Sequence, residues 1–286
     1  FVRGEHGGGR EGAQPVFVDV DPQTGGIKTP FNMAALSQRT KAVVVFHPYG
    51  RAISVQPLLH PLAARGIRVI EDASMARLAV YPDREEEVYD TAGTLGDFGL
   101  VTLGSEDRVA LLCTQRADYQ RAKRMLQTPF AELFPAEPLS EDLVPHHQKD
   151  IDKWQGQAEE QQCWASLIQE QLQGVGDLVV WPKADEKNHT ASMLLLRTGL
   201  RVPLLRFLHQ HHVFTLKPVS PLCVEHPMFI AEGFQAQDFP NALTLSQQGL
   251  LWAFNETEWA DSQRTDVICR TIRDFFARSG WPKADA

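Results

Sequence analysis

The stretch that decides the fold runs Ile67-Arg68-Val69-Ile70-Glu71-Asp72-Ala73-Ser74. Its β-branched residues predict a buried strand over 67–70, and two carboxylates follow at once. In α/β folds, ligands bind beyond the carboxyl ends of parallel strands, so Asp72 is a candidate to hold a positively charged ligand group. The structural alternative is that Asp72 caps a helix, because aspartate favours the N-cap position. The residues alone leave these two interpretations open.

Strand and helix patterns alternate on both sides of this stretch. The β-branched run 42–46 predicts a strand buried on both faces. Apolar residues at helical spacing cover 53–65, and Gly66 stands where a helix-ending glycine belongs. Such alternation predicts an α/β domain with a largely parallel sheet. The further elements predicted here are an extended, strand-like segment at 15–20, strands at 99–103 and 109–113, and a basic helix at 119–126.

The second half of the chain has a different pattern. Residues 128–148 are rich in proline and acidic side chains and predict a connector, and a long polar helix is expected over 150–172. The segments after it predict an α+β arrangement: strands at 178–181 and 193–197 and helices at 203–212 and 266–277. We therefore expect a large α/β domain over 1–149, and the family resemblance given below implies that its N-terminal part is missing. The long helix and a small α+β domain then occupy 150–286.

Composition limits the classes of partner. The 286 residues carry a formal net charge of −8, and nucleic acids and anionic membranes attract a surplus of Lys and Arg instead. No apolar run approaches the roughly 18 residues of a membrane-spanning helix. The start of the chain has no secretory signal pattern, and its four cysteines are scattered, so we expect a cytoplasmic protein with reduced thiols.

Two further motifs indicate ligand binding only weakly. Gly7 to Gly12 fits the spacing GxGxxG, but a dinucleotide site needs a strand before the glycines, and here the strand-like segment follows them. A flexible loop is the favoured interpretation, and nucleotide binding through 1–14 is a remote alternative. The histidines at 146–147 and 209–212 have no Asp, Glu or Cys at ligand spacing, so no metal site is predicted.

An ordered series of segments resembles the DegT/DnrJ/EryC1/StrS aminotransferases. The resemblance is good over 15–127, patchy beyond, and covers most of the chain. It implies the type I fold of pyridoxal-phosphate aminotransferases, with a large domain of mostly parallel sheet and a small α+β C-terminal domain. It also implies a homodimer with the active site near the subunit boundary. The segments that carry it are 15–21, 37–45, Phe46-His47-Pro48-Tyr49-Gly50, 66–73, 93–99 and 233–242.

The resemblance also implies roles for single residues. Asp72 would pair with the pyridine nitrogen of pyridoxal phosphate or pyridoxamine phosphate, and Thr102 stands where the family has a serine that contacts the phosphate. The position of the lysine that binds the cofactor covalently falls on Asp107, or on Glu106 if the register slips by one. A carboxylate can move a proton but cannot form that covalent bond, and the guanidinium of Arg108 stays protonated. No catalytic residue is therefore predicted.

Other departures from the family pattern favour the same conclusion. Thr215 to Leu222 lacks the arginine, histidine and tyrosine of the substrate-side segment, and Met75 replaces a glutamine. After His189, the aromatic residue and second histidine of the family are absent. Our first hypothesis is a non-catalytic binding or scaffold subunit, with an active paralogous sugar-biosynthetic enzyme as a candidate partner. The second is an active aminotransferase, or a lysine-independent dehydratase, of nucleotide-linked sugars.

Overall fold

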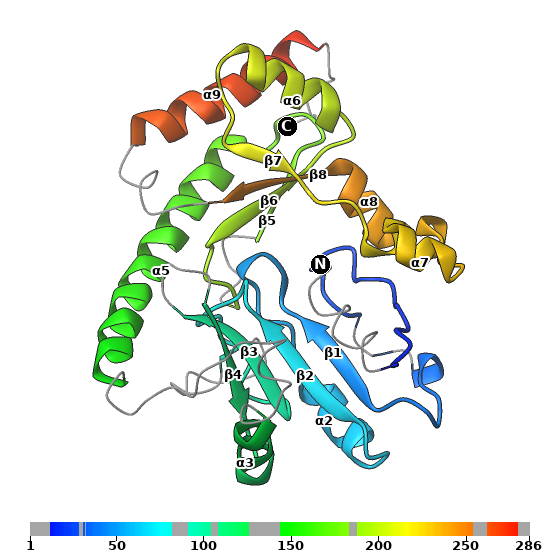
Figure 1. Ribbon diagram of the computed structural model, residues 1–286. Coiled ribbons are helices and arrows are strands. Elements are labelled where there is room, and N and C mark those ends of the chain that lie inside the picture. The colour runs from blue at the N-terminus through cyan, green and yellow to red at the C-terminus, as the bar shows by residue number, and fades with distance from the viewer. Residues whose placement is uncertain are drawn as a thin grey trace. The chain divides into compact units, whose positions relative to one another are not determined.

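The computed structural model divides into two compact units. Figure 1 shows the chain coloured from blue at the N-terminus to red at the C-terminus. The central unit comprises Leu36–Glu160 and Lys187–Thr190, and the terminal unit comprises the remaining segments, Phe1–Ala35, Gln161–Glu186 and Ala191–Ala286. The predicted boundary at residue 149 stays a prediction. The structure describes residues 12–28, 31, 33–81, 91–103, 108–125, 144–182, 188–253 and 262–279.

The central unit contains a four-stranded sheet in the order β1-β2-β3-β4. The first two neighbouring pairs are parallel, and β3 and β4 form an antiparallel pair. The predicted mostly parallel sheet is confirmed, and the antiparallel last strand is an addition that the sequence pattern did not predict. The strands are β1 (Ala42–Phe46), β2 (Arg68–Ala73), β3 (Phe98–Leu103) and β4 (Arg108–Cys113).

Three helical elements accompany this sheet. Helix α2 (Gln56–Ala63) connects β1 to β2 as a crossover and contacts β2. A single 3-10 turn, η2 (Pro48–Gly50), follows β1, and α3 (Arg116–Met125) follows β4. The short element η1 (Met33–Ala35) lies in the terminal unit.

Successive strand residues point to opposite faces of the sheet, and the two faces differ in exposure. One face, which we call the sealed face, is buried at Val43, Val45, Val69, Glu71, Ala73 and Gly99 and half-buried at Val101, Ala110 and Leu112. The other, the open face, is exposed or half-buried except at Asp72; its members are Val44, Ile70, Asp72, Phe98, Leu100, Thr102 and Leu111. The strand predicted to be buried on both faces, β1, is therefore buried on one only.

The long helix α5 (Val144–Leu172) begins earlier than predicted. The expected connector over 128–148 is wrong for its last five residues, because Pro145 lies in the first turn, where proline needs no hydrogen-bond partner for its nitrogen. The earlier residues of that connector lie outside the described part of the chain.

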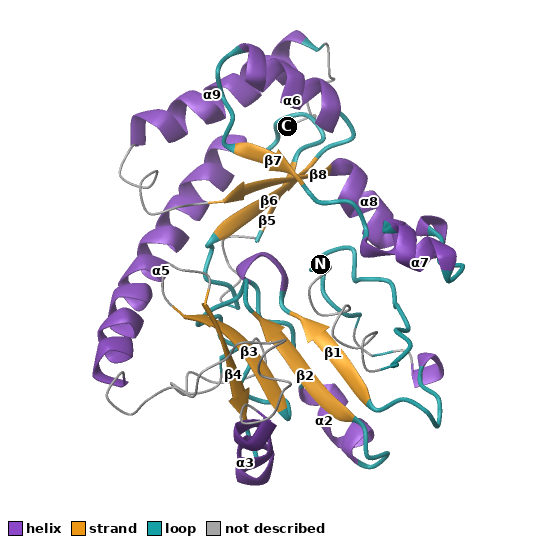
Figure 2. Cartoon of the chain, in the orientation of Figure 1, coloured by secondary structure: helices purple, strands orange, loops and turns teal. Residues whose placement is uncertain are grey.

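The terminal unit contains an antiparallel sheet in the order β5-β6-β8-β7, shown in orange in Figure 2. Its strands are β5 (Val179–Trp181), β6 (Met193–Arg197), β7 (Leu216–Pro218) and β8 (Gly249–Ala253). Its helical elements besides the end of α5 are α6 (Arg201–Gln210), η4 (Cys223–Glu225), α7 (Pro227–Ala231), η5 (Ala236–Asp238), α8 (Pro240–Gln248) and α9 (Ser262–Arg278). The predicted α+β character of this part is confirmed.

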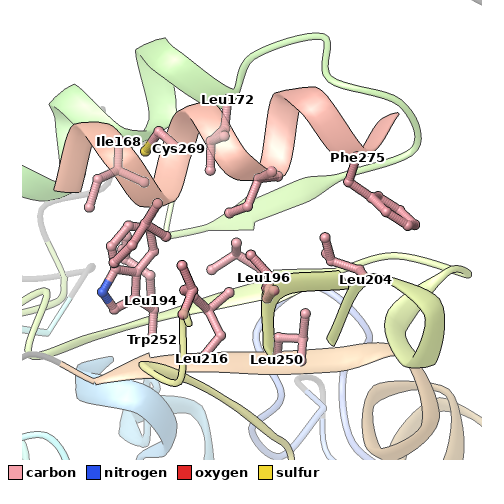
Figure 3. Close-up of a cluster of buried hydrophobic side chains, with 14 of the residues drawn as sticks. Ile168, Leu172, Leu194, Leu196, Leu204, Leu216, Leu250, Trp252, Cys269 and Phe275 are labelled. Atoms are coloured by element: carbon pink, nitrogen blue, oxygen red, sulfur yellow. The ribbon is translucent and has the colours of Figure 1, made fainter. Parts of the chain in front are cut away.

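The core of the terminal unit lies between this sheet and three helices. Leu172 from α5, Leu204 from α6 and Cys269 from α9 are fully or almost fully buried. They pack with strand residues such as Leu196 and Leu250, and Figure 3 shows these side chains meeting in one layer. The thiol of Cys269 belongs to this core, where burial raises its pKa to about 12.

The segment predicted to be strand-like, 15–20, docks through side chains instead. Among the described residues its only strand-type pairing is a single bridge between Val20 and Ile27. The ring of Phe17 makes edge contacts with Phe229, at a centroid distance of 5.0 Å. The carboxylate of Asp19 accepts hydrogen bonds from the first backbone amides of α8, at 2.9 and 3.0 Å. The segment therefore replaces ladder hydrogen bonds by an aromatic contact and a helix cap.

None of the helices in the described part of the chain has the apolar length that a membrane-spanning helix requires.

Candidate functional site

Asp72 lies at the carboxyl end of β2, on the open face, in the middle of the central sheet. Its Oδ1 accepts hydrogen bonds from the backbone nitrogen of Ser74, at 3.1 Å, and from the Ser74 hydroxyl, at 2.6 Å. A turn and not a helix follows β2, so the helix-cap interpretation of Asp72 is wrong. The carboxylate is held at the edge of the sheet where α/β folds place their ligands.

Thr102 lies on β3 and shares the open face with Asp72. Its hydroxyl donates to the backbone oxygen of Ser74, at 2.7 Å. Asp72 and Thr102, the two residues that the resemblance implies as cofactor ligands, are therefore both hydrogen-bonded to Ser74. The sequence had not indicated Ser74 for this task, because a serine two positions after an aspartate is common in turns.

These contacts fit one half of the cofactor better than the other. Among the described residues, Ser74 is the sole donor to the Asp72 carboxylate, so its second oxygen can accept a hydrogen bond from a protonated ring nitrogen. The single proton of the Thr102 hydroxyl is already donated to Ser74, so that hydroxyl must rotate before it can donate to a phosphate. The arrangement therefore provides an acceptor for the nitrogen of a pyridine ring, but no hydroxyl proton of Thr102 that is free to bind the phosphate.

Glu71, the neighbour of Asp72, lies on the sealed face and is completely buried. Its Oε2 accepts from His47 Nε2 at 3.0 Å, from the Tyr81 hydroxyl and, more weakly, from Gly93 N at 3.4 Å. Its Oε1 accepts from two further backbone amides, Leu95 N at 2.9 Å and Gly96 N at 2.5 Å. Burial raises the pKa of Glu71, but the hydrogen bonds from His47 and Tyr81 outweigh that effect and leave the pKa below the usual glutamate range.

Two glycines allow the loop that carries these amides to approach the sheet. A Cβ on Gly99 would lie 1.9 Å from the backbone oxygen of Gly93, which no real structure tolerates. Gly93 itself has φ near +93°, a conformation that disfavours other residues. The loop over 91–97 can therefore lie directly on β3 and direct its amides at Glu71.

The turn after β1 is fixed on two sides. Ala52 N donates to Asn188 O at 2.7 Å, and Thr190 N donates to Gly50 O at 2.9 Å, so a segment distant in sequence is bound to this turn. Tyr49, within the turn, has the left-handed φ of 56°, which is unusual for a residue with a large side chain. Burial raises the pKa of Tyr49 to about 12.

The positions in place of the lysine, Glu106 and Asp107, lie outside the described residues. The sequence itself contains no lysine between Lys41 and Lys123. Lys41 immediately precedes β1, at the amino ends of the parallel strands and so at the edge opposite to Asp72. No strand of the central sheet therefore carries a lysine. Lys217, on β7, belongs to the terminal unit, where it is exposed.

Histidine and cysteine side chains form no metal centre within the described ranges, where no group of three or more His, Cys, Asp or Glu could hold an ion. His209 and His211 are exposed and stack on Phe214 and Phe207 respectively. The glycines of the weak GxGxxG match lie outside the described residues except for Gly12.

Comparison with known proteins gives a consistent family. The model of the DegT/DnrJ/EryC1/StrS aminotransferase family matches residues 9–102. A pleiotropic regulatory protein of Geobacillus stearothermophilus is 27% identical over 285 residues, which cover 93% of this chain and 74% of that protein. GDP-perosamine synthase of Caulobacter vibrioides is 30% identical over 118 residues, 41% of this chain, and the match spans only 31% of its own length.

The fold extends the likeness to nearly the whole chain. A solved structure of DesI, in the presence of its TDP-sugar product, superposes with a TM-score of 0.78 at 20% identity. That match covers 98% of this chain and 73% of DesI. Members of the family bind pyridoxal phosphate or pyridoxamine phosphate. The predicted type I fold of the pyridoxal-phosphate aminotransferases is confirmed, and the predicted resemblance to the DegT/DnrJ/EryC1/StrS aminotransferases is borne out by the family model over residues 9–102.

Proposed function

We propose that this chain is a diverged family member that binds its cofactor or a related ligand without covalent attachment and does not transaminate. The observation that carries the proposal is the absence of lysine from positions 42–122, which include all four strands of the central sheet. The family resemblance places the covalent lysine within this range, at Asp107 or Glu106. Transamination requires an amine at that point, and a carboxylate cannot replace it.

The relative that matches over most of its length supports a role other than catalysis. That protein is named a pleiotropic regulatory protein, while the sequence matches to enzymes with aminotransferase names cover 32% to 41% of the chain. A regulatory or scaffold subunit needs the ligand pocket and the fold but not the covalent chemistry. We therefore propose a binding role in sugar or polysaccharide biosynthesis, in the cytoplasm, as a homodimer or beside an active paralogous enzyme.

The residues that would hold the ligand are those on the open face. Asp72 would bind the ring nitrogen through its free oxygen, with Ser74 fixing the carboxylate in place. Thr102 would contact the phosphate after its hydroxyl rotates away from Ser74. When bound, pyridoxamine phosphate supplies an amine and an electron-accepting ring, and the pairing at Asp72 keeps that ring protonated.

Covalent trapping tests the proposal directly. The purified protein is incubated with pyridoxal phosphate, treated with borohydride and digested for mass spectrometry. We expect no stoichiometric modification of any lysine, while calorimetry detects reversible binding of pyridoxamine phosphate. The non-covalent assignment would be overturned by stoichiometric modification of a single lysine that disappears when this lysine is replaced by arginine. Lys217→Arg is the first variant to compare.

A second candidate function is a lysine-independent dehydratase, or an active aminotransferase, of nucleotide-linked keto sugars. The retained carboxylate at Asp72 favours this function. A neutral side chain could accept the same hydrogen bonds from Ser74, so the turn does not require the negative charge. Product analysis distinguishes the two functions. Turnover of a nucleotide-linked keto sugar with pyridoxamine phosphate, abolished in Asp72→Asn, would support the enzyme and contradict the binding subunit.

A further inference from the structure

Glu71 gathers three separate segments around one buried carboxylate. His47 belongs to the turn after β1, Tyr81 follows β2, and the amides of Leu95 and Gly96 belong to the loop before β3. These groups are 24, 10, 24 and 25 residues away from Glu71 in the sequence. A buried carboxylate with this many donors keeps its charge without water.

The hydrogen bonds fix the proton on the histidine ring. Ile53 N donates to His47 Nδ1 at 2.9 Å, so that nitrogen is an acceptor and carries no proton. The proton therefore sits on Nε2, which donates to Glu71 at 3.0 Å. The pair therefore retains the negative charge of Glu71.

Two of these segments are linked to Asp72 as well. His47 N donates to the backbone oxygen of Asp72 at 2.9 Å, which joins the turn after β1 to the residue that carries the site carboxylate. The loop over 91–97 leads directly into β3, which pairs with β2 and carries Thr102. Because Glu71 and Asp72 are consecutive strand residues, their side chains occupy opposite faces of one sheet edge.

We propose that Glu71 is the positioning residue of the Asp72 site. From the sealed face it holds the segments that border Asp72 and Thr102, and its charge adds to that of Asp72 in attracting a protonated ring nitrogen. The identity of the ligand, a protonated ring nitrogen, rests on the proposed function. The role of Glu71 in holding this edge of the sheet does not.

The test replaces Glu71 by a side chain of the same size without charge. Glu71→Gln presents an amide to donors that need an acceptor, so we expect amide exchange over 47–53 and 91–97 to rise about tenfold or more. The affinity for pyridoxamine phosphate should fall about tenfold, and the pH above which binding weakens should move to a lower value. Hydrogen-exchange mass spectrometry and calorimetry across pH measure these effects.

A matched carboxylate in the terminal unit is the control. Asp177 accepts from the Thr198 hydroxyl at 2.5 Å and from Gly199 N at 2.8 Å, so Asp177→Asn should raise exchange near 198–199 and leave pyridoxamine phosphate binding within about twofold. If Glu71→Gln does not fold, Tyr81→Phe removes one donor only and should raise exchange over 91–97 by about threefold.

The outcomes separate this inference from the proposed function. Exchange over 47–53 and 91–97 that stays at the wild-type rate in both variants would overturn the positioning role. A loss of affinity with an unchanged pH profile would reduce Glu71 to a structural residue. If the wild-type protein binds no pyridoxamine phosphate, the proposed ligand is wrong, and the exchange result still decides whether Glu71 holds this edge.

Discussion

The two faces of the central sheet carry neighbouring residues of the same strands in opposite surroundings. Val45 is completely buried on the sealed face, whereas Val44 is 58% exposed on the open face. Both oxygens of Glu71 accept hydrogen bonds from distant segments, whereas one oxygen of Asp72 accepts hydrogen bonds from Ser74 in the adjacent turn. The sealed face maintains the structure, and the open face carries Asp72, the carboxylate to which we assign the ligand in the proposed function.

The largest effect is expected where the loop touches the sealed face. In Gly99→Ala the added methyl would meet the Gly93 backbone, which cannot move aside as a flexible side chain could. We expect a loss of about 3 kcal/mol or more in the free energy of unfolding, or no folded protein. Urea denaturation measures this loss. Gly156→Ala in α5, where nothing lies within 4 Å, should instead be neutral or stabilising by up to about 1 kcal/mol.

The charge on Glu71 makes the sealed face sensitive to pH. The folded protein lowers the pKa of Glu71, so the stabilisation is fully present above the unfolded pKa, about 4.3, and is lost as the pH falls through the lower folded pKa. Glu71→Gln should cost about 2 kcal/mol or more at pH 7. The difference in unfolding free energy from wild type should shrink below about pH 4. A difference that is the same at pH 7 and pH 3.5 would contradict this assignment.

The two valines of β1 give a direct measure of the contrast between the faces. Val45→Ala removes fully buried methyl groups and should cost about 2 kcal/mol. Val44→Ala removes largely exposed ones and should change stability by less than about 0.5 kcal/mol. Equal losses in paired urea titrations would mean that the open face is covered in solution.

The sequence could predict the strands and the place of Asp72, because both depend on local patterns. Runs of β-branched residues predicted β1 and the first part of β2. The strand continues through both carboxylates to Ala73, and Asp72 lies at the carboxyl edge of the parallel strands. The network of Glu71 could not be predicted, since its partners are up to 25 residues away and no spacing links them. Thr102 was selected only through the family resemblance, and its contact with Ser74 depends on the register of β2 and β3.

The differences in the fold have equally specific causes. The segment 15–20 has the alternation of a strand, but Phe17 inserts among aromatic rings and Asp19 caps α8, and both contacts join residues more than 200 positions apart. The antiparallel direction of β4 follows from the short connection after β3, which is too short for a helical crossover.

The smallest effect on stability is expected at Asp72, and it is the change that most sharply separates the two faces. In Asp72→Asn the amide oxygen still accepts from Ser74, so the free energy of unfolding should change by less than about 0.5 kcal/mol. The affinity for pyridoxamine phosphate should nevertheless fall about tenfold or more, because a hydrogen bond between two charged groups is replaced by a neutral one. Thr102→Ser retains the hydroxyl and should keep the affinity within about twofold, which controls for general disturbance of the edge. Calorimetric titration and urea denaturation of the same samples measure both quantities. A variant that loses stability but keeps its affinity would contradict this contrast, because Asp72 would then serve the fold, as Glu71 does, and would not bind the ligand.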